Sequence, residues 1–288
     1  MLSEGARVAV VAPSGIFNPE RLQSGIDLIT SWGLQVVEGR NLHARHRVTA
    51  GTIQQRSADL TWALTDKQID AVWFARGGYG TAQLLSHLPW SECDGRPVIG
   101  FSDATALLVA MERVGITGGI HGPVLHSLAG HTSEDSAAAL KKMLLEGGSY
   151  WLKGRHLCGP HRAVQGRLVG GNLCVLASLA GTPWSLRSNG AIVVLEDINE
   201  PAYKIDRLIS QLRDSGALDG AVGIALGDFT DCTTPSSADW TLHDIFMDLL
   251  SPLGLPVISG LPIGHGSRNR PWQVGVEGVL SVEGLHVG

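Results

Sequence analysis

Residues 7–15 read Arg-Val-Ala-Val-Val-Ala-Pro-Ser-Gly, and this stretch decides the fold class. A short apolar run bounded by turn residues is typical of a buried strand, and Val8–Ala12 is such a run, ended by Pro13 and Gly15. The next segment, 19–32, places Leu22, Ile26 and Ile29 on one face of a helix. A buried strand followed directly by an amphipathic helix is the first unit of an α/β sheet.

The same alternation continues through the first half of the chain. We predict further strands at 34–37, 71–75, 97–101 and 118–122, and helices at 52–65 and 103–113. In the helix 52–65, Ile53, Leu60 and Leu64 are spaced to pack inward. Strands that alternate with helices indicate a mainly parallel sheet covered on both faces, which places its functional sites at the carboxyl ends of the strands.

The pattern changes after about residue 147, where Gly, Pro, His and Arg mix without periodicity. We interpret 153–165 as a linker between an N-terminal domain, 1–152, and a C-terminal domain, 166–288. In the second domain, strand-like runs at 191–195 and 221–226 flank a helical stretch at 203–212.

Composition excludes several classes of protein. The 288 residues are 44% apolar and 17% charged, so the chain can bury a sizeable core. A net charge of −5 with scattered basic residues argues against nucleic-acid binding. The first residues lack the layout of a signal peptide, and no apolar run approaches the roughly 18 residues of a membrane span. Four separated cysteines (Cys93, Cys158, Cys174 and Cys232) favour reduced thiols in a cytoplasmic protein over disulfides or a zinc site.

Ser102 lies between a buried strand and a helix, in the sequence Gly100-Phe101-Ser102-Asp103-Ala104. A nucleophile on such a tight turn needs small residues two positions before and after it, and Gly100 and Ala104 meet that need. The match to a hydrolase elbow is partial, because the last position is Ala. On this segment alone, a helix N-cap is the more common role for such a serine.

A serine nucleophile requires a base and a group that orients the base. His265 is flanked by Gly264 and Gly266, although a histidine in a surface loop is the more frequent case. Glu196 follows the apolar run 192–195, where a buried carboxylate needs a partner. An ion pair with Arg207 is the structural alternative for Glu196.

The segment Arg76-Gly77-Gly78-Tyr79-Gly80 follows the predicted strand 71–75. Its glycines leave backbone N–H groups free to face a ligand, so it fits a phosphate loop, an oxyanion hole or a structural turn. It matches neither GxGxxG nor the Walker pattern. From the local sequence alone, the turn is favoured.

Together these segments resemble the LD-carboxypeptidase (muramoyltetrapeptide carboxypeptidase) family, with its microcin-immunity relatives. The resemblance covers most of the chain and rests on the following segments: 10–15, 50–51 with Arg56, Asp59 and Leu60, 75–80, 100–103 with 105–107, 121–123, 166–168, 170–173, 181–183, 195–197 with Glu200, Tyr203 and 205–207, and 264–266.

The resemblance implies an α/β fold with a flavodoxin-like parallel-sheet N-terminal domain and a smaller β-rich C-terminal domain. It implies a serine peptidase in which Ser102 is the nucleophile, His265 the general base and Glu196 the residue that orients it. Backbone N–H groups of Gly78 and Asp103 would form the oxyanion hole, and Arg76 and Tyr79 are candidates for substrate binding.

The implied reaction removes the terminal D-alanine from the murein tetrapeptide in the cytoplasm, as part of peptidoglycan recycling. The implied enzyme needs no metal or other cofactor and is a homodimer. Its partner is a small muropeptide, and neither a nucleic acid nor a membrane is expected.

One stretch departs from the family pattern, since Trp272 and Val274 stand where a Leu-Pro-x-Gly-like segment is expected. This puts substrate choice in doubt. The closest alternative is therefore a microcin-immunity-type hydrolase of peptidyl or aminoacyl nucleotide analogues, in which Trp184 or Trp272 would stack on the base, although packing is the more common role for either. A non-catalytic α/β binding protein is the alternative from another class, and a nucleotide-binding enzyme that uses residues 77–80 is more distant.

Overall fold

The computed structural model describes residues 1–287, which divide into two compact units. The first unit comprises 1–148 together with the short segment 270–272, and the second comprises 149–269 and the chain from 273 onward. The chain therefore leaves the second unit after Asn269, contributes three residues to the first, and returns at Gln273.

Within the described residues, the sheet of the first unit has six strands in the order β12-β5-β4-β3-β1-β2. Their bounds are β1 (Arg7–Val11), β2 (Gln35–Glu38), β3 (Ala71–Phe74), β4 (Val98–Gly100), β5 (Gly119–His121) and β12 (Trp272–Gln273). Strands β1 to β5 pair in parallel, in the order 2-1-3-4-5 that characterises flavodoxin-like sheets. The predicted fold class is confirmed.

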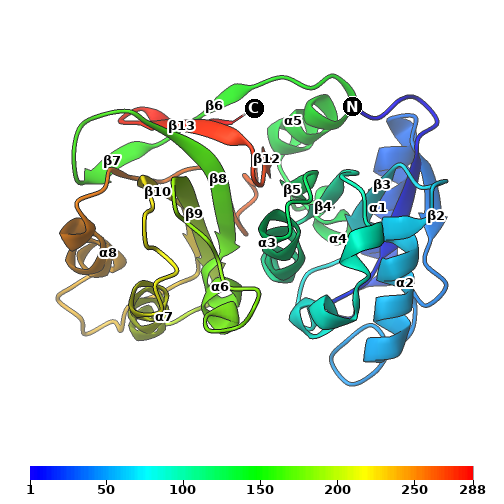
Figure 1. Cartoon of the computed structure of the whole chain (residues 1–288), viewed down its shortest axis with the longest axis horizontal. Helices are drawn as coiled ribbons and strands as arrows, with labels where there is room; N and C mark the ends of the chain where they lie inside the picture. The colour runs from blue at the N-terminus through cyan, green and yellow to red at the C-terminus, as the bar shows by residue number, and fades with distance from the viewer. Residues whose placement is uncertain (288) are drawn as a thin grey trace. The chain divides into compact units, whose positions relative to one another are not determined.

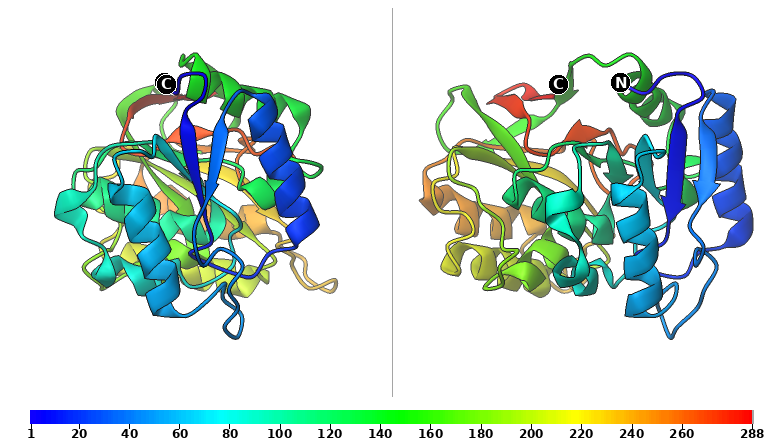
Figure 2. Two further views of the ribbon diagram at one scale, coloured as in Figure 1. Left: turned by 90° about the vertical axis from the view of Figure 1, so that its right-hand side faces the viewer. Right: turned by 45° about the vertical axis from the view of Figure 1, so that its right-hand side comes forward.

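Helices lie on both faces of this sheet, with α1 and α2 on opposite sides of its β1–β2 end (Figures 1 and 2). The helical elements are α1 (Pro19–Ser31), α2 (Ile53–Thr65), η1 (Thr81–His87), η2 (Trp90–Glu92), η3 (Ser102–Ala104), α3 (Thr105–Arg113), α4 (Leu125–Leu128) and α5 (Glu134–Leu145). The predicted inward face of α1 is buried. In α2, Leu60 and Leu64 are buried, but Ile53 is 39% exposed because it stands at the first helical position, beyond the sheet's cover.

The second unit is built on a sheet whose eight strands, among the described residues, follow the order β6-β14-β13-β8-β9-β10-β11-β7. Four of them pair in parallel: β8 (Val164–Asn172), β9 (Ala191–Ile198), β10 (Gly223–Thr230) and β11 (Val257–Ser259). They are linked by α6 (Leu173–Leu179), α7 (Ala202–Asp214), and α8 (Leu242–Leu250) with η4 (Ser251–Leu253). Antiparallel strands β6 (Tyr150–Lys153), β7 (Arg155–Cys158), β13 (Glu277–Ser281) and β14 (Gly284–Val287) complete the sheet.

The linker predicted at 153–165 is not a linker in the structure. These residues hold all of β7, the last residue of β6 and the start of β8, and they belong to the sheet of the second unit. Edge strands such as β7 are short and partly exposed, so their sequence lacks the apolar run by which the buried strands were recognised.

In each unit the loops at the carboxyl ends of the parallel strands carry the polar candidates from the sequence. Ser102 follows β4 and the loop 75–80 follows β3, whereas Glu196 lies near the end of β9 and His265 follows β11. None of the helices formed by residues 1–287 combines the length and apolar character that crossing a membrane requires.

Candidate active site

Ser102 stands on a strained turn between β4 and the helical segment η3–α3. Its φ angle is +62°, in the left-handed region that non-glycine residues rarely adopt, at a typical cost of roughly 1–3 kcal/mol. Such strain is concentrated at functional sites, and a serine on a sharp strand-to-helix turn has the geometry of a nucleophile elbow. The alternative role as a helix cap is wrong, since the N-cap positions of η3 and α3 are Phe101 and Ala104, without side-chain cap bonds.

The turn is closed so tightly that neighbouring positions accept only small residues. A Cβ atom added at Gly100 would lie 2.7 Å from the Cβ of Ala104, which confirms the reason for the small residues around Ser102. A Cβ at Gly77 would lie 2.9 Å from the Cβ of Ser102 and 3.0 Å from its Oγ. The glycine loop after β3 therefore packs its backbone directly against the serine side chain.

That glycine loop is fixed by buried polar side chains at its far end. The Asp103 carboxylate accepts a hydrogen bond from the backbone N–H of Thr81 at 2.8 Å, so the residue after Ser102 ties the two loops together. The buried Arg56 guanidinium donates to the carbonyls of Gly80 at 2.9 Å and Pro13 at 2.5 Å. Burial lowers the pKa of Arg56, while the charge of Asp103 opposes that shift. The loop is thus held in place rather than free to drift.

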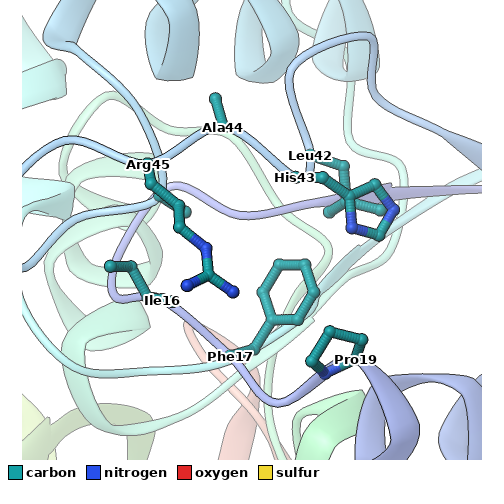
Figure 3. A pocket seen from close by; sticks show the side chains of 8 residues that line it. Ile16, Phe17, Pro19, Leu42, His43, Ala44 and Arg45 are labelled. Carbon is teal, nitrogen blue, oxygen red and sulfur yellow. The ribbon is translucent and has the colours of Figure 1, made fainter.

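Arg76 and Tyr79 project from the same loop. Tyr79 is 58% exposed, and Arg76 donates from Nη1 to the carbonyl oxygen of Ile16. Ile16 also lines a small pocket of about 60 Å³ in the first unit, where the Arg45 guanidinium extends between Ile16 and Phe17 (Figure 3). Two cationic side chains, Arg76 and Arg45, therefore lie close to Ile16 in the first unit.

In the second unit, Glu196 and His265 form a short hydrogen bond of 2.7 Å between Oε2 and Nδ1. Glu196 is fully buried, and the side chain of His265 is 13% exposed. Burial disfavours the charged imidazole, but the charge and the hydrogen bond of Glu196, with a further contribution from Asp197, outweigh it, so the pKa of His265 is raised. A carboxylate bound to Nδ1 favours the tautomer in which Nδ1 carries the proton and Nε2 does not, as a general base requires.

The backbone around His265 leaves no room for larger residues. A Cβ at Gly264 would lie 2.9 Å from Oε2 of Glu196, and one at Gly227 would lie 2.4 Å from the carbonyl oxygen of Ile263. The loop is also closed on itself, because the N–H of Gly264 donates to Oδ1 of the buried Asn269 at 3.3 Å. Gly264 thus permits a close approach to the Glu196 carboxylate, and a Cβ at Gly266 would lie 2.8 Å from Oδ2 of Asp228.

Asp197 lies on the neighbouring position of β9 and is held by three donors. It accepts from Nδ2 of Asn172 and from the N–H groups of Cys174 and Ile198, each at 2.9 Å. Burial nevertheless raises the pKa of Asp197 to about 6, and the charge of Glu196 adds to the shift. This arrangement fixes the end of β9, and with it the backbone of Glu196.

The ion pair of Glu196 with Arg207, the structural alternative for that carboxylate, is not formed. The Arg207 guanidinium instead lies 5.4 Å from the ring centroid of Tyr203. Trp272 is fully buried and Trp184 partly buried. Among residues 1–287, no cluster of three or more His, Cys, Asp or Glu side chains could hold a metal ion.

Family models match both halves of the chain. Residues 8–122 match the N-terminal domain of LD-carboxypeptidases, and residues 165–280 match their C-terminal domain. The chain belongs to the LD-carboxypeptidase family. As a member, it is a hydrolase with the two-part α/β architecture described above.

Relatives of this LD-carboxypeptidase align along almost its whole length. It is 39% identical to the murein tetrapeptide carboxypeptidase of Pseudomonas aeruginosa, over 95% of this chain and 92% of that protein. It is 38% identical to a putative carboxypeptidase of Synechocystis, over 97% and 92% of the two chains. The muramoyltetrapeptide carboxypeptidase structure from Oxalobacter formigenes matches with a TM-score of 0.87 at 29% identity, covering 98% of this chain and 99% of the other.

Microcin-immunity proteins share the fold of this LD-carboxypeptidase. The structure of MccF with glutamyl sulfamoyl guanosine has a TM-score of 0.87 at 20% identity, covering 99% of this chain and 96% of that one. The MccF sequence from Escherichia coli is 23% identical over 96% of this chain and 90% of its own length.

Sequence reasoning missed the structural roles of Arg56 and of the Asp103 side chain in this LD-carboxypeptidase. A signal was present for Arg56, because it lies three positions after Ile53 and four before Leu60, on the apolar face of α2. A charge at an inward position of a helix must be paired or hydrogen-bonded, which identifies it as a buried structural group. Asp103 gave no comparable signal, since one acidic residue at the start of a helix is ordinary.

Proposed function

We propose that this protein is a serine-type LD-carboxypeptidase in which Ser102, His265 and Glu196 act as a catalytic triad. The observation that carries the proposal is the left-handed backbone of Ser102 on the turn after β4, since strain of this kind is maintained where a side chain must be presented. The 2.7 Å bond between Glu196 and His265 supplies the second element, an oriented base.

In the proposed reaction, Ser102 Oγ attacks the carbonyl of an L-configured residue that precedes a C-terminal D-amino acid. His265 accepts the serine proton through Nε2 and later gives it to the leaving amine, while Glu196 stabilises the imidazolium. Collapse of the tetrahedral intermediate breaks the peptide bond and leaves an acyl-enzyme. Water, activated by the same histidine, then hydrolyses the ester and regenerates Ser102.

The backbone N–H groups of Gly78 and Asp103 are the proposed oxyanion donors. The contact of Gly77 with the Ser102 side chain and the bond from Thr81 to Asp103 support this assignment, because they hold both donor segments close to the nucleophile. Fixed donors are effective because they need no reorganisation as charge develops, and loss of one typically costs about 10²–10³ in rate.

The proposed substrate is a murein tetrapeptide, cut between diaminopimelate and the terminal D-alanine. The whole-length similarity to the Pseudomonas murein tetrapeptide carboxypeptidase supports it. Arg76 and the exposed Tyr79 would contact the substrate, since both project from the loop beside Ser102. On the family resemblance we further propose a homodimer that recycles peptidoglycan fragments in the cytoplasm.

Mass spectrometry of muropeptides treated with wild type and Ser102→Ala tests the proposal. The substrates are the tetrapeptide ending in D-alanine and its L-alanine epimer. We expect wild type to release D-alanine and to spare the epimer, and the variant to be slower by at least about 10³-fold, as for other triad serines. Cleavage that survives Ser102→Ala in a folded protein would exclude the triad, and wild type inert toward both peptides would exclude the substrate.

A microcin-immunity-type activity is the second candidate function. It is supported by the fold shared with MccF, whose structure was solved with glutamyl sulfamoyl guanosine, and the half-buried Trp184 is the candidate for stacking on a base. The buried Trp272 offers no such surface.

A further inference from the structure

The segment from Gly264 to Trp272 carries His265 at one end and a buried tryptophan at the other. His265 and Asn269 belong to the second unit, whereas the three residues 270–272 belong to the first. Trp272 begins β12, the edge strand next to β5 in the first unit's sheet. One short stretch of chain therefore holds the proposed base and an anchor in the unit that bears the proposed nucleophile.

Trp272, the anchor, packs within the first unit in a row of three aromatic rings, and the last of these rings belongs to the residue before Ser102. Trp272 is fully buried and stacks on His121, with ring centroids 5.2 Å apart and planes inclined by 20°. His121 in turn meets the edge of Phe101, with centroids 5.9 Å apart, and Phe101 directly precedes Ser102. The position of Trp272 is thus defined relative to the turn that presents Ser102.

The path from the anchor back to His265 is short and constrained. Asn269 is three residues before Trp272, so their Cα atoms are at most about 11 Å apart even in a fully extended chain. Asn269 Oδ1 then accepts from the N–H of Gly264 at 3.3 Å, which closes the loop that contains His265. Displacement of the anchor would therefore be transmitted to the imidazole through few rotatable bonds.

We propose that Trp272 is a positioning residue for catalysis, which anchors the short stretch of chain that carries His265 in the first unit's sheet. The inference rests on the proposed triad. It also gives a role to the departure from the family pattern at 272, which the proposed chemistry does not use. A general base must be held to a fraction of an ångström, and a misplacement of about 1 Å costs roughly 10²-fold in rate.

The matched variants are Trp272→Ala, Trp272→Phe and a control, Trp73→Phe. Phe keeps a ring to stack on His121, and it loses no hydrogen bond, because Nε1 of Trp272 has no partner among residues 1–287. Trp73 is equally buried in the same sheet, and its indole donates to the carbonyl of Pro123 at 2.9 Å, so the control also disturbs the unit's core.

We expect Trp272→Ala to lower kcat for D-alanine release by roughly 10²-fold with KM within about threefold, because alignment rather than binding is lost. In the pH–rate profile of Trp272→Ala, the pKa at which activity rises with pH should equal that of wild type, since Glu196 and His265 keep their hydrogen bond within the second unit. Trp272→Phe should keep kcat within about threefold of wild type, and Trp73→Phe should lower Tm but not kcat. Wild-type kcat in Trp272→Ala, or an equal loss in Trp73→Phe, would overturn the inference.

Two further measurements keep the inference testable if Trp272→Ala folds poorly or the substrate assignment fails. Asn269→Ala opens the loop without touching the core around Trp272, and it should lower kcat in the same way; full activity would count against the positioning role. Amide hydrogen exchange needs no substrate. Exchange at residues 264–269 should accelerate in Trp272→Phe less than in Trp272→Ala and not at all in Trp73→Phe, and unchanged exchange in Trp272→Ala would refute the anchor even if no murein peptide is cleaved.

Discussion

At the scale of single residues, the site depends on a buried carboxyl group that is hydrogen-bonded to an imidazole. Glu196 is fully buried and hydrogen-bonded to His265, whose pKa it raises against the effect of burial. A buried ion pair of this kind contributes little net stability, but removal of one partner is costly. The pair is therefore better explained by the chemistry of the imidazole than by stability of the fold.

Replacement of the carboxylate tests this electrostatic assignment. Only neutral His265 can accept the serine proton, so activity should rise with pH through a pKa above the usual 6.5 of histidine. Glu196→Gln removes the negative charge that raises the pKa of His265, so burial lowers that pKa against only the smaller effect of Asp197. The acid limb of the pH–rate profile should therefore move to lower pH, and kcat should fall by about 10⁴-fold.

The measurement is the pH profile of kcat/KM for wild type and Glu196→Gln, with Asp214→Asn as the control. Asp214 is an exposed partner of Arg213 on α7, and its loss should change neither the limb nor the rate. An acid limb that stays in place in Glu196→Gln would show that the titrating group is not His265.

Prediction from sequence is possible for candidate residues whose local pattern carries the physical requirement. Ser102 stands between small residues on a strand-to-helix turn, and His265 stands between glycines, so both could be singled out without coordinates. Asn269 could not be found in this way, since its role is to bond a backbone N–H five residues earlier in a loop without periodicity.

At the scale of elements, two loops and one turn of the first unit form a single rigid assembly. The turn after β4 contacts the loop after β3 through Gly77, and Arg56 on α2 joins that loop to the segment after β1. Parallel strands bring these loops to one edge of the sheet, as the alternating pattern predicted. The boundaries of β1 and α1 were predicted within one residue because an apolar run ended by turn residues defines β1, and a capping residue followed by proline begins α1.

Gly77→Ala tests the contact between these elements. The added methyl would lie 2.9 Å from the Cβ of Ser102, so either the serine rotamer or the loop must shift, and we expect kcat to fall by roughly 10²-fold. Gly130→Ala is the control, since its φ of +95° makes alanine unfavourable but nothing lies within 4 Å of the new methyl. This control should lower Tm without loss of kcat, and wild-type kcat in Gly77→Ala would show that the contact does not constrain the serine.

At the scale of the whole molecule, the chain crosses between its two units more often than a sequence pattern can reveal. The predicted linker at 153–165 contains β7, and the three residues 270–272 return to the first unit. Both elements are short and lie at sheet edges, where few residues contribute to a periodic signal. Their positions are decided by long-range pairing, with β7 on β11 and β12 next to β5.

The choice between a murein peptide and an aminoacyl nucleotide as substrate is argued from similarity along the whole chain. Binding of a nucleotide analogue tests that choice. Identity is 39% with a murein tetrapeptide carboxypeptidase and 23% with MccF, each along nearly the full length, and Trp272 is buried where an exposed ring would be needed for stacking. We therefore expect aspartyl sulfamoyl adenosine to leave the Tm of the Ser102→Ala protein unchanged. The murein tetrapeptide should raise it, because a ligand at 100 times its Kd adds about 2.7 kcal/mol to the stability of the folded state.

If the nucleotide analogue raises Tm instead, and Trp184→Ala abolishes that rise, the site belongs to an aminoacyl-nucleotide hydrolase and the murein assignment is wrong. If the analogue still raises Tm in Trp184→Ala, the murein assignment is wrong as well, but the nucleobase binds to a surface other than Trp184.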